Sequence, residues 1–414
     1  KVYVSDEGGP DWKYAWLDAK AAGADGHGTY DYQLLRDGEA FWIGKIEFEV
    51  IHTPGHTPEH VCFLVTDHGS GADEPVGILT GDFVFVGDLG RPDLLETAAG
   101  QAGAMEPSAR QLHKSLARLR DIPDFTQVWP GHGAGSACGK ALGAVPASTM
   151  GYERRFSPAM QAAGDEQGFV DFILEGQPEP PMYFAAMKHD NKHGPRVLGG
   201  LTIPPRVDAA TLATVDASAQ VIIDTREWES FRDAHLPGSL YIPLNAGFCT
   251  DAGSFVTADD AIWLVVEPAL VERAVRALVR IGLDRIEGWC SPEDLEAAFA
   301  GGTASTSIAE VDPAEAAALL ENGRARSLDV RRATEFAGGH VPGATNIAHT
   351  RLASRLDELP GDGPILVNCR SGGRSARASA YLKRAGRDVI NLAGGYSAWS
   401  ASPAASSQPK GSHA

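Results

Sequence analysis

A cysteine at the start of a short loop rich in glycine and arginine is the strongest chemical signal in the chain. The loop reads Cys369-Arg370-Ser371-Gly372-Gly373-Arg374-Ser375, and it lies between an apolar run at 365–367 and a helix predicted over 375–385. The N–H groups of such a loop can point into one concavity, and the helix N-terminus and the two arginines add positive charge. A thiolate is favoured over a thiol in this setting and becomes a nucleophile. The same loop would stabilise a persulfide on Cys369.

Three further side chains each follow the end of a predicted strand. They are His56 in Thr-Pro-Gly-His-Thr, Asp82 in Thr-Gly-Asp, and His132 in Pro-Gly-His-Gly. Residues placed just past strand ends can converge at one edge of a sheet. Because imidazole and carboxylate are ligands of zinc and of non-haem Fe(II), these residues predict a metal site.

Two residues near this predicted site are candidates for binding a substrate. Arg91 could hold an anionic group, or it could form a structural salt bridge with Asp88 or Asp93. Cys138, six residues after His132, could relay sulfur, or it could be a small residue packed in a loop. His52 and His60 flank His56 and are interpreted as structural or supporting residues. Cys62, Cys249 and Cys290 are interpreted as structural.

Composition limits the classes of function. The net charge of −18 argues against a nucleic-acid surface and against an anionic membrane. No apolar run approaches the roughly 20 residues of a membrane helix. The five cysteines form no CxxC pair, which favours a reducing, cytoplasmic compartment over a disulfide framework.

An internal repeat predicts the architecture of the second half. Asp224-Thr225-Arg226 and the His-Leu-Pro-Gly at 235–238 recur 105 positions later as Asp329-Val330-Arg331 and the His-Val-Pro-Gly at 340–343. We therefore expect two copies of one α/β domain with parallel sheets, over 207–300 and 305–402. In the first copy we assign Glu267 to the cysteine position, so that copy cannot carry a persulfide. Residues 403–414 are predicted to be disordered.

The first 200 residues predict a different domain. Strands are expected over 45–51, 61–65, 76–79 and 127–129, and a helix over 108–120 with Ser108 as its N-cap. The chain begins with Lys1 and enters a predicted strand at once, so we expect a preceding segment of this domain.

The second repeat resembles rhodanese sulfurtransferases. The cysteine loop, the Asp-Val-Arg and His-Val-Pro-Gly motifs, and Gly-Gly-Tyr-Ser-Ala-Trp at 394–399 carry this resemblance. It implies that Cys369 is catalytic and that residues 370–375 form the anion-binding loop. Cysteine-dependent phosphatases are the near alternative, but their loop spacing is Cys-x5-Arg, whereas Cys369 and Arg374 are spaced as Cys-x4-Arg.

The first 200 residues resemble the metallo-β-lactamase superfamily, which implies an αββα sandwich. Gly90-Arg91-Pro92-Asp93 and the fused rhodanese-like domain resemble its persulfide dioxygenase branch. That resemblance implies one Fe(II) per chain, held by His56, Asp82 and a third histidine expected upstream of Lys1, with His132 close to the metal. The His-x-His-x-Asp-His motif of the superfamily is absent from the sequence.

These resemblances imply a persulfide dioxygenase–sulfurtransferase that detoxifies sulfide and persulfide. The expected partners are a small thiol persulfide, thiosulfate, sulfite and O2, and the expected assembly is a homo-oligomer. One alternative is a glyoxalase II-like thioester hydrolase with two zinc ions. The other is an inactive metal-domain scaffold that leaves only the rhodanese-like domain active.

Overall fold

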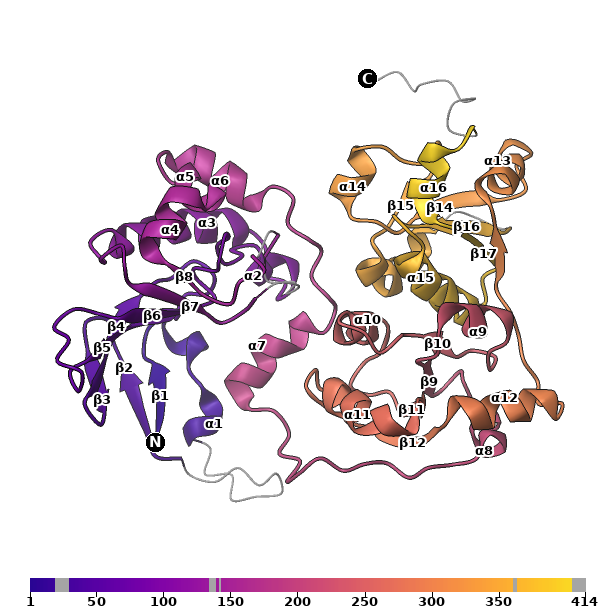
Figure 1. Cartoon of the computed structure of the whole chain (residues 1–414), viewed down its shortest axis with the longest axis horizontal. Helices are drawn as coiled ribbons and strands as arrows, with labels where there is room; N and C mark the ends of the chain where they lie inside the picture. Colours follow the sequence, from indigo (N-terminus) through magenta and orange to yellow (C-terminus); the bar gives the residue numbers. More distant parts are fainter. Residues whose placement is uncertain (19–29, 134–138, 141–142, 360–362, 404–414) are drawn as a thin grey trace. The chain divides into compact units, whose positions relative to one another are not determined.

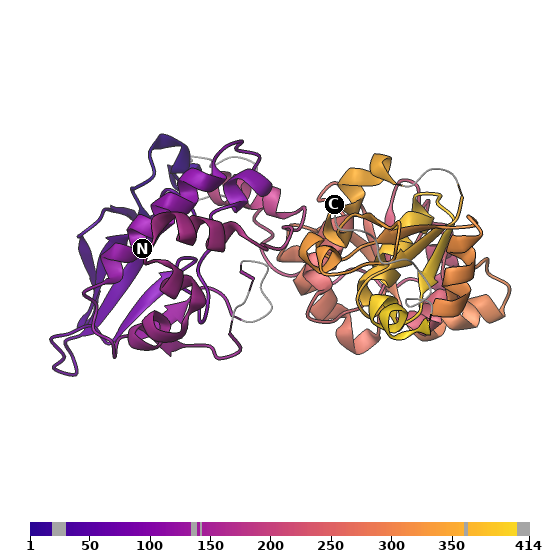
Figure 2. The same cartoon turned by 90° about the horizontal axis from the view of Figure 1, so that it is seen from above.

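The computed structural model of the protein describes residues 1–18, 30–133, 139–140, 143–359 and 363–403. The chain divides into two compact units (Figures 1 and 2). Unit 1 comprises Lys1–Pro180 and Phe184–Val197, and unit 2 comprises Pro181–Tyr183 and Leu198–Ala414. In the part of the chain that the structure describes, no helix is long and apolar enough to cross a membrane.

Unit 1 contains a two-stranded and a six-stranded sheet. The small sheet pairs β1 (Val2–Ser5) with β2 (Tyr32–Leu35) in parallel. The larger sheet has the order β3 (Ala40–Ile43), β4 (Ile46–His52), β5 (Val61–Asp67), β6 (Gly77–Gly81), β7 (Gln127–Pro130) and β8 (Ser148–Thr149). Only its β6–β7 pair is parallel.

The helices of unit 1 are mostly short. They are α1 (Ala15–Asp18), α2 (Leu94–Thr97), α3 (Met105–Leu116), α4 (Met150–Phe156), α5 (Pro158–Ala162), α6 (Glu166–Leu174) and α7 (Phe184–His193), with 3-10 turns at Pro10–Trp12 and Ala117–Leu119. Buried side chains of α3 and α6 share a core with the sheet residues Ile51, Ile78 and Val128. This packing fixes the strand ends that carry the predicted metal ligands.

The start of α3 corrects a sequence prediction. Ser108 was expected to cap the helix, but the helix begins at Met105 and Ser108 lies inside it. The N–H of Met105 donates to Oε2 of Glu96 at 3.0 Å. The first turn is therefore stabilised by a carboxylate from an earlier segment, which a local capping pattern does not reveal.

Unit 2 contains two parallel sheets, as the repeat predicts. The first has the order β10 (Leu240–Tyr241), β9 (Val221–Asp224), β11 (Ile262–Val265) and β12 (Ile286–Cys290). The second has the order β13 (Ala309–Val311), β17 (Val389–Leu392), β16 (Ile365–Asn368), β14 (Arg326–Asp329) and β15 (Thr345–Asn346).

Helices connect these strands. Those of the first copy are α8 (Ala209–Ala213), α9 (Trp228–Asp233), α10 (Phe248–Phe255), α11 (Val271–Val279, after a 3-10 turn at Pro268–Leu270) and α12 (Pro292–Ala300). Those of the second copy are α13 (Pro313–Glu321), α14 (Ala333–Ala337), the 3-10 helix η4 (His349–Glu358), α15 (Gly373–Arg384) and α16 (Gly395–Ala401).

The repeated Asp-x-Arg motifs make the same contacts in both copies. Arg331 donates from Nε and Nη2 to the carboxylate of Asp329, and Nη2 also donates to the carbonyl of Gly339. Arg226 does the same with Asp224 and the carbonyl of Ala234. All four side chains are buried, and within each pair the arginine compensates the negative charge of the aspartate. The repeated motif is therefore a structural support for the strand end in both copies.

Candidate functional site

Cys369 lies directly after β16, at the mouth of the turn that leads into α15. Its side chain is buried, and the N–H of Gly372 donates to Sγ at 3.1 Å. Gly372 adopts φ +108, a conformation that glycine permits and other residues rarely adopt. This turn directs one backbone donor to the sulfur at the N-terminus of α15.

The two arginines of the loop have different surroundings. Arg370 is exposed, together with Ser371 and Gly373. Arg374 is half-buried and donates from Nη1 and Nη2 to the two carboxylate oxygens of Glu335, at 2.6 and 2.8 Å. The pKa of Glu335 is lowered to about 2, and the hydrogen bonding from Arg374 is the main cause. Glu335 lies on α14, and the sequence analysis did not single it out.

The backbone of α16 closes the other side of the loop. Tyr396 N–H donates to the carbonyl of Cys369 at 2.6 Å, and Ser397 N–H donates to the carbonyl of Arg370 at 2.9 Å. Gly395 has φ +59, and a Cβ there would lie 2.5 Å from the carbonyl oxygen of Cys369. The glycine of this motif is therefore required by a close backbone approach, not only by a turn.

The strand register corrects the residue assigned to the cysteine position of the first copy. Asp329 is paired with Asn368, the residue before Cys369, and the equivalent Asp224 is paired with Val265. Val266, which is fully buried, therefore occupies the cysteine position, and Glu267 follows it. The sequence comparison misplaced the position by one residue because the shortened loop offers no glycine to align. The first copy lacks a cysteine at that position in either case.

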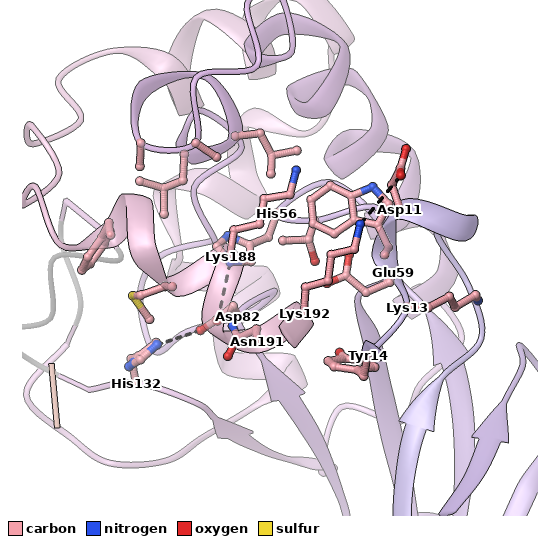
Figure 3. A pocket seen from close by; sticks show the side chains of 18 residues that line it. Asp11, Lys13, Tyr14, His56, Glu59, Asp82, His132, Lys188, Asn191 and Lys192 are labelled. Atoms are coloured by element: carbon pink, nitrogen blue, oxygen red, sulfur yellow. Dashed lines mark ion pairs between the residues drawn. The ribbon is translucent and has the colours of Figure 1, made fainter. Parts of the chain in front are cut away.

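In unit 1 the structure brings His56, Asp82 and His132 together (Figure 3). Nε2 of His56 lies 3.5 Å from Oδ2 of Asp82, and Nε2 of His132 lies 3.0 Å from Oδ1. Nδ1 of His56 contacts the carbonyl of Arg91 at 3.0 Å. Because a carbonyl only accepts, Nδ1 is the donor in this contact, which orients the ring of His56 with Nε2 toward Asp82.

This arrangement fits a metal ion in part. Two ligand atoms of one ion, each bonded at about 2 Å, lie roughly 3 to 3.5 Å apart, and the atoms of His56 and Asp82 match this spacing. Oδ1 of Asp82 is buried and accepts no hydrogen bond of ordinary geometry. Within the described residues, however, no three His, Cys, Asp or Glu side chains form a group that could hold an ion by themselves.

His60 supports Asp82 through a buried hydrogen-bond chain. The N–H of Asp82 donates to Nε2 of His60 at 3.1 Å, and Nδ1 of His60 contacts Oγ1 of Thr53 at 2.8 Å. Burial lowers the pKa of His60 to about 4, so the ring is neutral. Thr53 also lies 3.2 Å from Sγ of Cys62, and burial raises the pKa of that thiol to about 12. His60 thus supports the backbone of Asp82, and Cys62 is a buried thiol beside Thr53.

The two candidate substrate-binding residues have different outcomes. Arg91 is 1% exposed and donates to both carboxylate oxygens of Asp93, at 2.9 and 2.5 Å. The structure therefore shows the salt bridge that was the alternative interpretation of Arg91. Cys138 lies outside the described residues, as do residues 404–414 of the predicted tail.

A cavity of about 170 Å³ opens beside His56, Asp82 and His132 (Figure 3). Its wall combines apolar side chains of α2 with Phe184, Met187 and Lys188 of α7. Lys188 stacks over the ring of Trp12, with Nζ 4.4 Å from the ring centre. Burial raises the pKa of Glu59, which also lines the cavity. The helix that ends unit 1 thus forms part of this wall, a feature that the sequence analysis missed.

Comparisons with known proteins agree with both halves of this description. A family model described as Rhodanese-like domain matches residues 312–402. Thiosulfate sulfurtransferase GlpE of Pseudomonas fluorescens is 36% identical over 90 residues, which are 22% of this chain and 82% of that protein. A metallo-beta-lactamase structure from Staphylococcus aureus subsp. aureus COL is 36% identical, covers 70% of this chain and 77% of its own, and has a TM-score of 0.60.

Other matches are partial. Hydroxyacylglutathione hydrolase of Gloeobacter violaceus is 35% identical over 98 residues, which are 24% of this chain and 31% of that protein. The chain spans about half the length of several further curated relatives, for example 47% of the Mycobacterium leprae protein ML0493.

The fold and the two sites define a fusion of a metallo-β-lactamase-like domain with a rhodanese domain. Through its C-terminal domain the chain belongs to the rhodanese family. The predicted fold class is thereby confirmed.

Proposed function

We propose that the protein is a sulfurtransferase that carries sulfane sulfur as a persulfide on Cys369. The observation that carries this proposal is the hydrogen bond from Gly372 N–H to Sγ of Cys369 at the N-terminus of α15. A terminal persulfide sulfur is an anion, and a loop of backbone donors at a helix N-terminus favours an anion. The similarity to a thiosulfate sulfurtransferase supports thiosulfate as a donor.

The transfer has two balanced steps. The thiolate of Cys369 attacks the sulfane sulfur of thiosulfate, the S–S bond of the donor breaks, and sulfite leaves with the bonding electron pair. A thiolate acceptor then attacks the terminal sulfur of the persulfide, and Cys369 leaves as a thiolate. No oxidant or reductant is consumed, and the loop binds an anionic sulfur after each step.

The test is thiosulfate-to-thiol transfer by the native protein and by Cys369→Ser. The native protein should release sulfite and form an acceptor persulfide, and Cys369→Ser should do neither. Cys249→Ser is the matched control, because Cys249 is a partly exposed thiol of the first copy whose pKa burial raises. Transfer at the native rate by Cys369→Ser would contradict the proposal.

For unit 1 the proposed function is oxidation of a low-molecular-weight thiol persulfide to sulfite. His56 and Asp82 would hold one Fe(II) together with a ligand outside the described residues, and His132 would lie beside it. When bound, this ion would supply the activation of O2. His56 is oriented by the carbonyl of Arg91, Asp82 is oriented by His60, and the cavity lined by α7 would receive the persulfide.

The overall reaction of this half balances as persulfide plus O2 plus water giving thiol, sulfite and two protons. Four electrons pass from the sulfane sulfur to O2. A persulfide is the substrate of this reaction and the covalent intermediate on Cys369, which supports the two chemistries in one chain.

The test is oxygen uptake by Fe(II)-loaded protein on addition of glutathione persulfide, with sulfite measured in parallel. Uptake with one sulfite formed per O2 is the expected result. The partial similarity to a hydroxyacylglutathione hydrolase favours a second candidate, a thioester hydrolase with two zinc ions. Two zinc ions per chain, thioester cleavage and no oxygen uptake would establish that candidate instead.

A further inference from the structure

We infer that the cysteine-less copy completes the Cys369 site: its residue Asp251 compensates the positive charge of Arg377 beside the cysteine loop, and thereby tunes Cys369 as a nucleophile. This inference rests on the proposed role of Cys369 and assigns a role to a domain that has no cysteine of its own at the equivalent position.

The two copies share one hydrophobic core, and Cys369 is part of it. Buried side chains of both copies, among them Phe248 and Ala252 of α10 and Ala376 and Ala380 of α15, belong to the same cluster as Cys369. The rings of Phe255 and Tyr381 stack with centres 4.8 Å apart. The helix that begins at the cysteine loop is therefore packed directly against the other copy.

Helix α15 is also tied to the first copy by polar contacts. Near its C-terminus, Arg384 donates to the carbonyls of Gly238 and Gln220, at 2.7 and 3.0 Å. Nearer its N-terminus, Nε of Arg377 lies 2.5 Å from Oδ2 of Asp251. Contacts along its length thus fix the axis of α15 relative to the first copy.

Asp251 is a buried carboxylate that is paired with two side chains. It is 4% exposed, and its Oδ1 lies 3.3 Å from Nε2 of His349 on η4. Burying a carboxylate is costly unless it is paired, and both of its cationic or donor partners come from the catalytic copy. The backbone of His349 in turn donates to the carbonyl of Val330, whose own N–H donates to the carbonyl of Asn368.

The guanidinium of Arg377 reaches the cysteine loop. A Cβ placed on Gly373 would lie 3.2 Å from Nη1 of Arg377, so this nitrogen lies close to Gly373, the residue after the Gly372 donor of Cys369. Arg377 therefore joins the loop at one end and the first copy at the other.

The remaining charges around the loop are compensated within the catalytic copy or face solvent. Arg374 pairs with Glu335, Arg331 pairs with Asp329, and Arg370 is exposed. Arg377 differs because its carboxylate comes from the first copy. Removing that carboxylate should raise the positive potential at the loop, and removing Arg377 should leave a buried negative charge there.

The experiment measures alkylation of Cys369 by iodoacetamide against pH, by mass spectrometry of the Cys369 peptide. Asp251→Asn should lower the pH midpoint, and Arg377→Gln should raise it, each by about half a pH unit or more. The double variant Asp251→Asn/Arg377→Gln should lie close to the native midpoint, because the two charges are removed together. A merely structural role would not shift the single variants in opposite directions.

Arg232→Gln is the matched control, because Arg232 forms another ion pair between the copies, with Glu310 on β13 at 2.8 Å. It should leave the midpoint unchanged. Equal midpoints in all variants, or shifts of the same sign in both single variants, would overturn the inference. If a single variant fails to fold, the double variant compared with the other single variant still gives the sign. The two single variants could shift in opposite directions while the native protein forms no persulfide from thiosulfate. That result would count against the proposed function alone.

Discussion

Glu335 belongs to no motif, yet it orients an arginine of the cysteine loop. Its two carboxylate oxygens bind the two terminal nitrogens of Arg374, which fixes the plane of the guanidinium beside the loop. The sequence motif contains Arg374 but gives no indication of its partner, which lies 39 residues earlier on α14. Only the folded chain brings the two together.

The lowered pKa of Glu335 predicts a pH dependence of stability. A carboxyl group with a depressed folded-state pKa stabilises the fold above its unfolded value, and this contribution is lost as the pH falls through the folded value. For Glu335 the window runs from 4.5 down to about 2. As the pH falls over this range, the stability of Glu335→Gln should decrease less than that of the native protein. Thermal unfolding measured at each pH checks this. Parallel curves for the two proteins would contradict the assigned pairing.

Asp82 is the residue on which the predicted metal site depends most. It faces His56 through one oxygen and His132 through the other. Asp82→Ala should therefore reduce iron bound per chain at least about 10-fold, since ligands and their supports typically control affinity on that scale.

Iron content after gel filtration, measured by elemental analysis, tests this expectation. His113→Gln is the control, because His113 on α3 contacts the carbonyl of Ala163 and not the site. Retention of iron in Asp82→Ala would remove Asp82 from the ligand set.

At the scale of elements, the approach of α16 to the cysteine loop should limit what residue 395 can be. Gly395→Ala combines a positive φ with a Cβ 2.5 Å from the carbonyl of Cys369, so the loop must move. Because this movement displaces the backbone of Cys369, the rate of sulfur transfer should fall by about 100-fold.

Gly386→Ala separates the two effects. Gly386 also has a positive φ, +77, but a Cβ there meets nothing within 4 Å. It should lose about 1 kcal/mol of stability from backbone strain and keep its transfer rate. Equal loss of transfer in both variants, measured with thiosulfate under matched folding, would show that the contact with Cys369 is irrelevant.

Elements with local signals could be predicted, and those with distant partners could not. The strand at 61–65 and the helix after Gly372 follow from apolar patterns and glycine. The start of α3 depends on Glu96, and the cysteine position of the first copy depends on strand register. Both errors arose where a contact between distant segments, and not the local sequence, decides the structure.

At the scale of the whole molecule, the repeat was visible because its Asp-x-Arg motifs must be kept to support each strand end. Site residues that belong to no sequence motif could not be predicted from the sequence. Asp251, His349 and Arg377 belong to no motif. For Arg91 the sequence left substrate binding and a salt bridge open, and the structure shows the salt bridge with Asp93.

The first copy should not become a second transfer site when it is given a cysteine. Val266→Cys in a Cys369→Ser background would place a buried thiol before Glu267 and Pro268, with a carboxylate in place of Arg370 and no glycine donor. We expect no transfer from thiosulfate, because neither the anion-binding loop nor its positive charge is present. Recovery of a tenth or more of the native rate would contradict this account of the loop.

The central claim is that Cys369 carries the sulfur. The most direct measurement is mass spectrometry of the native protein after brief exposure to thiosulfate, with every cysteine-containing peptide examined. The account predicts one added sulfur atom on the Cys369 peptide, lost again when a thiol acceptor is supplied. Absence of that added sulfur, or its appearance on Cys62, Cys138, Cys249 or Cys290 instead, would contradict it.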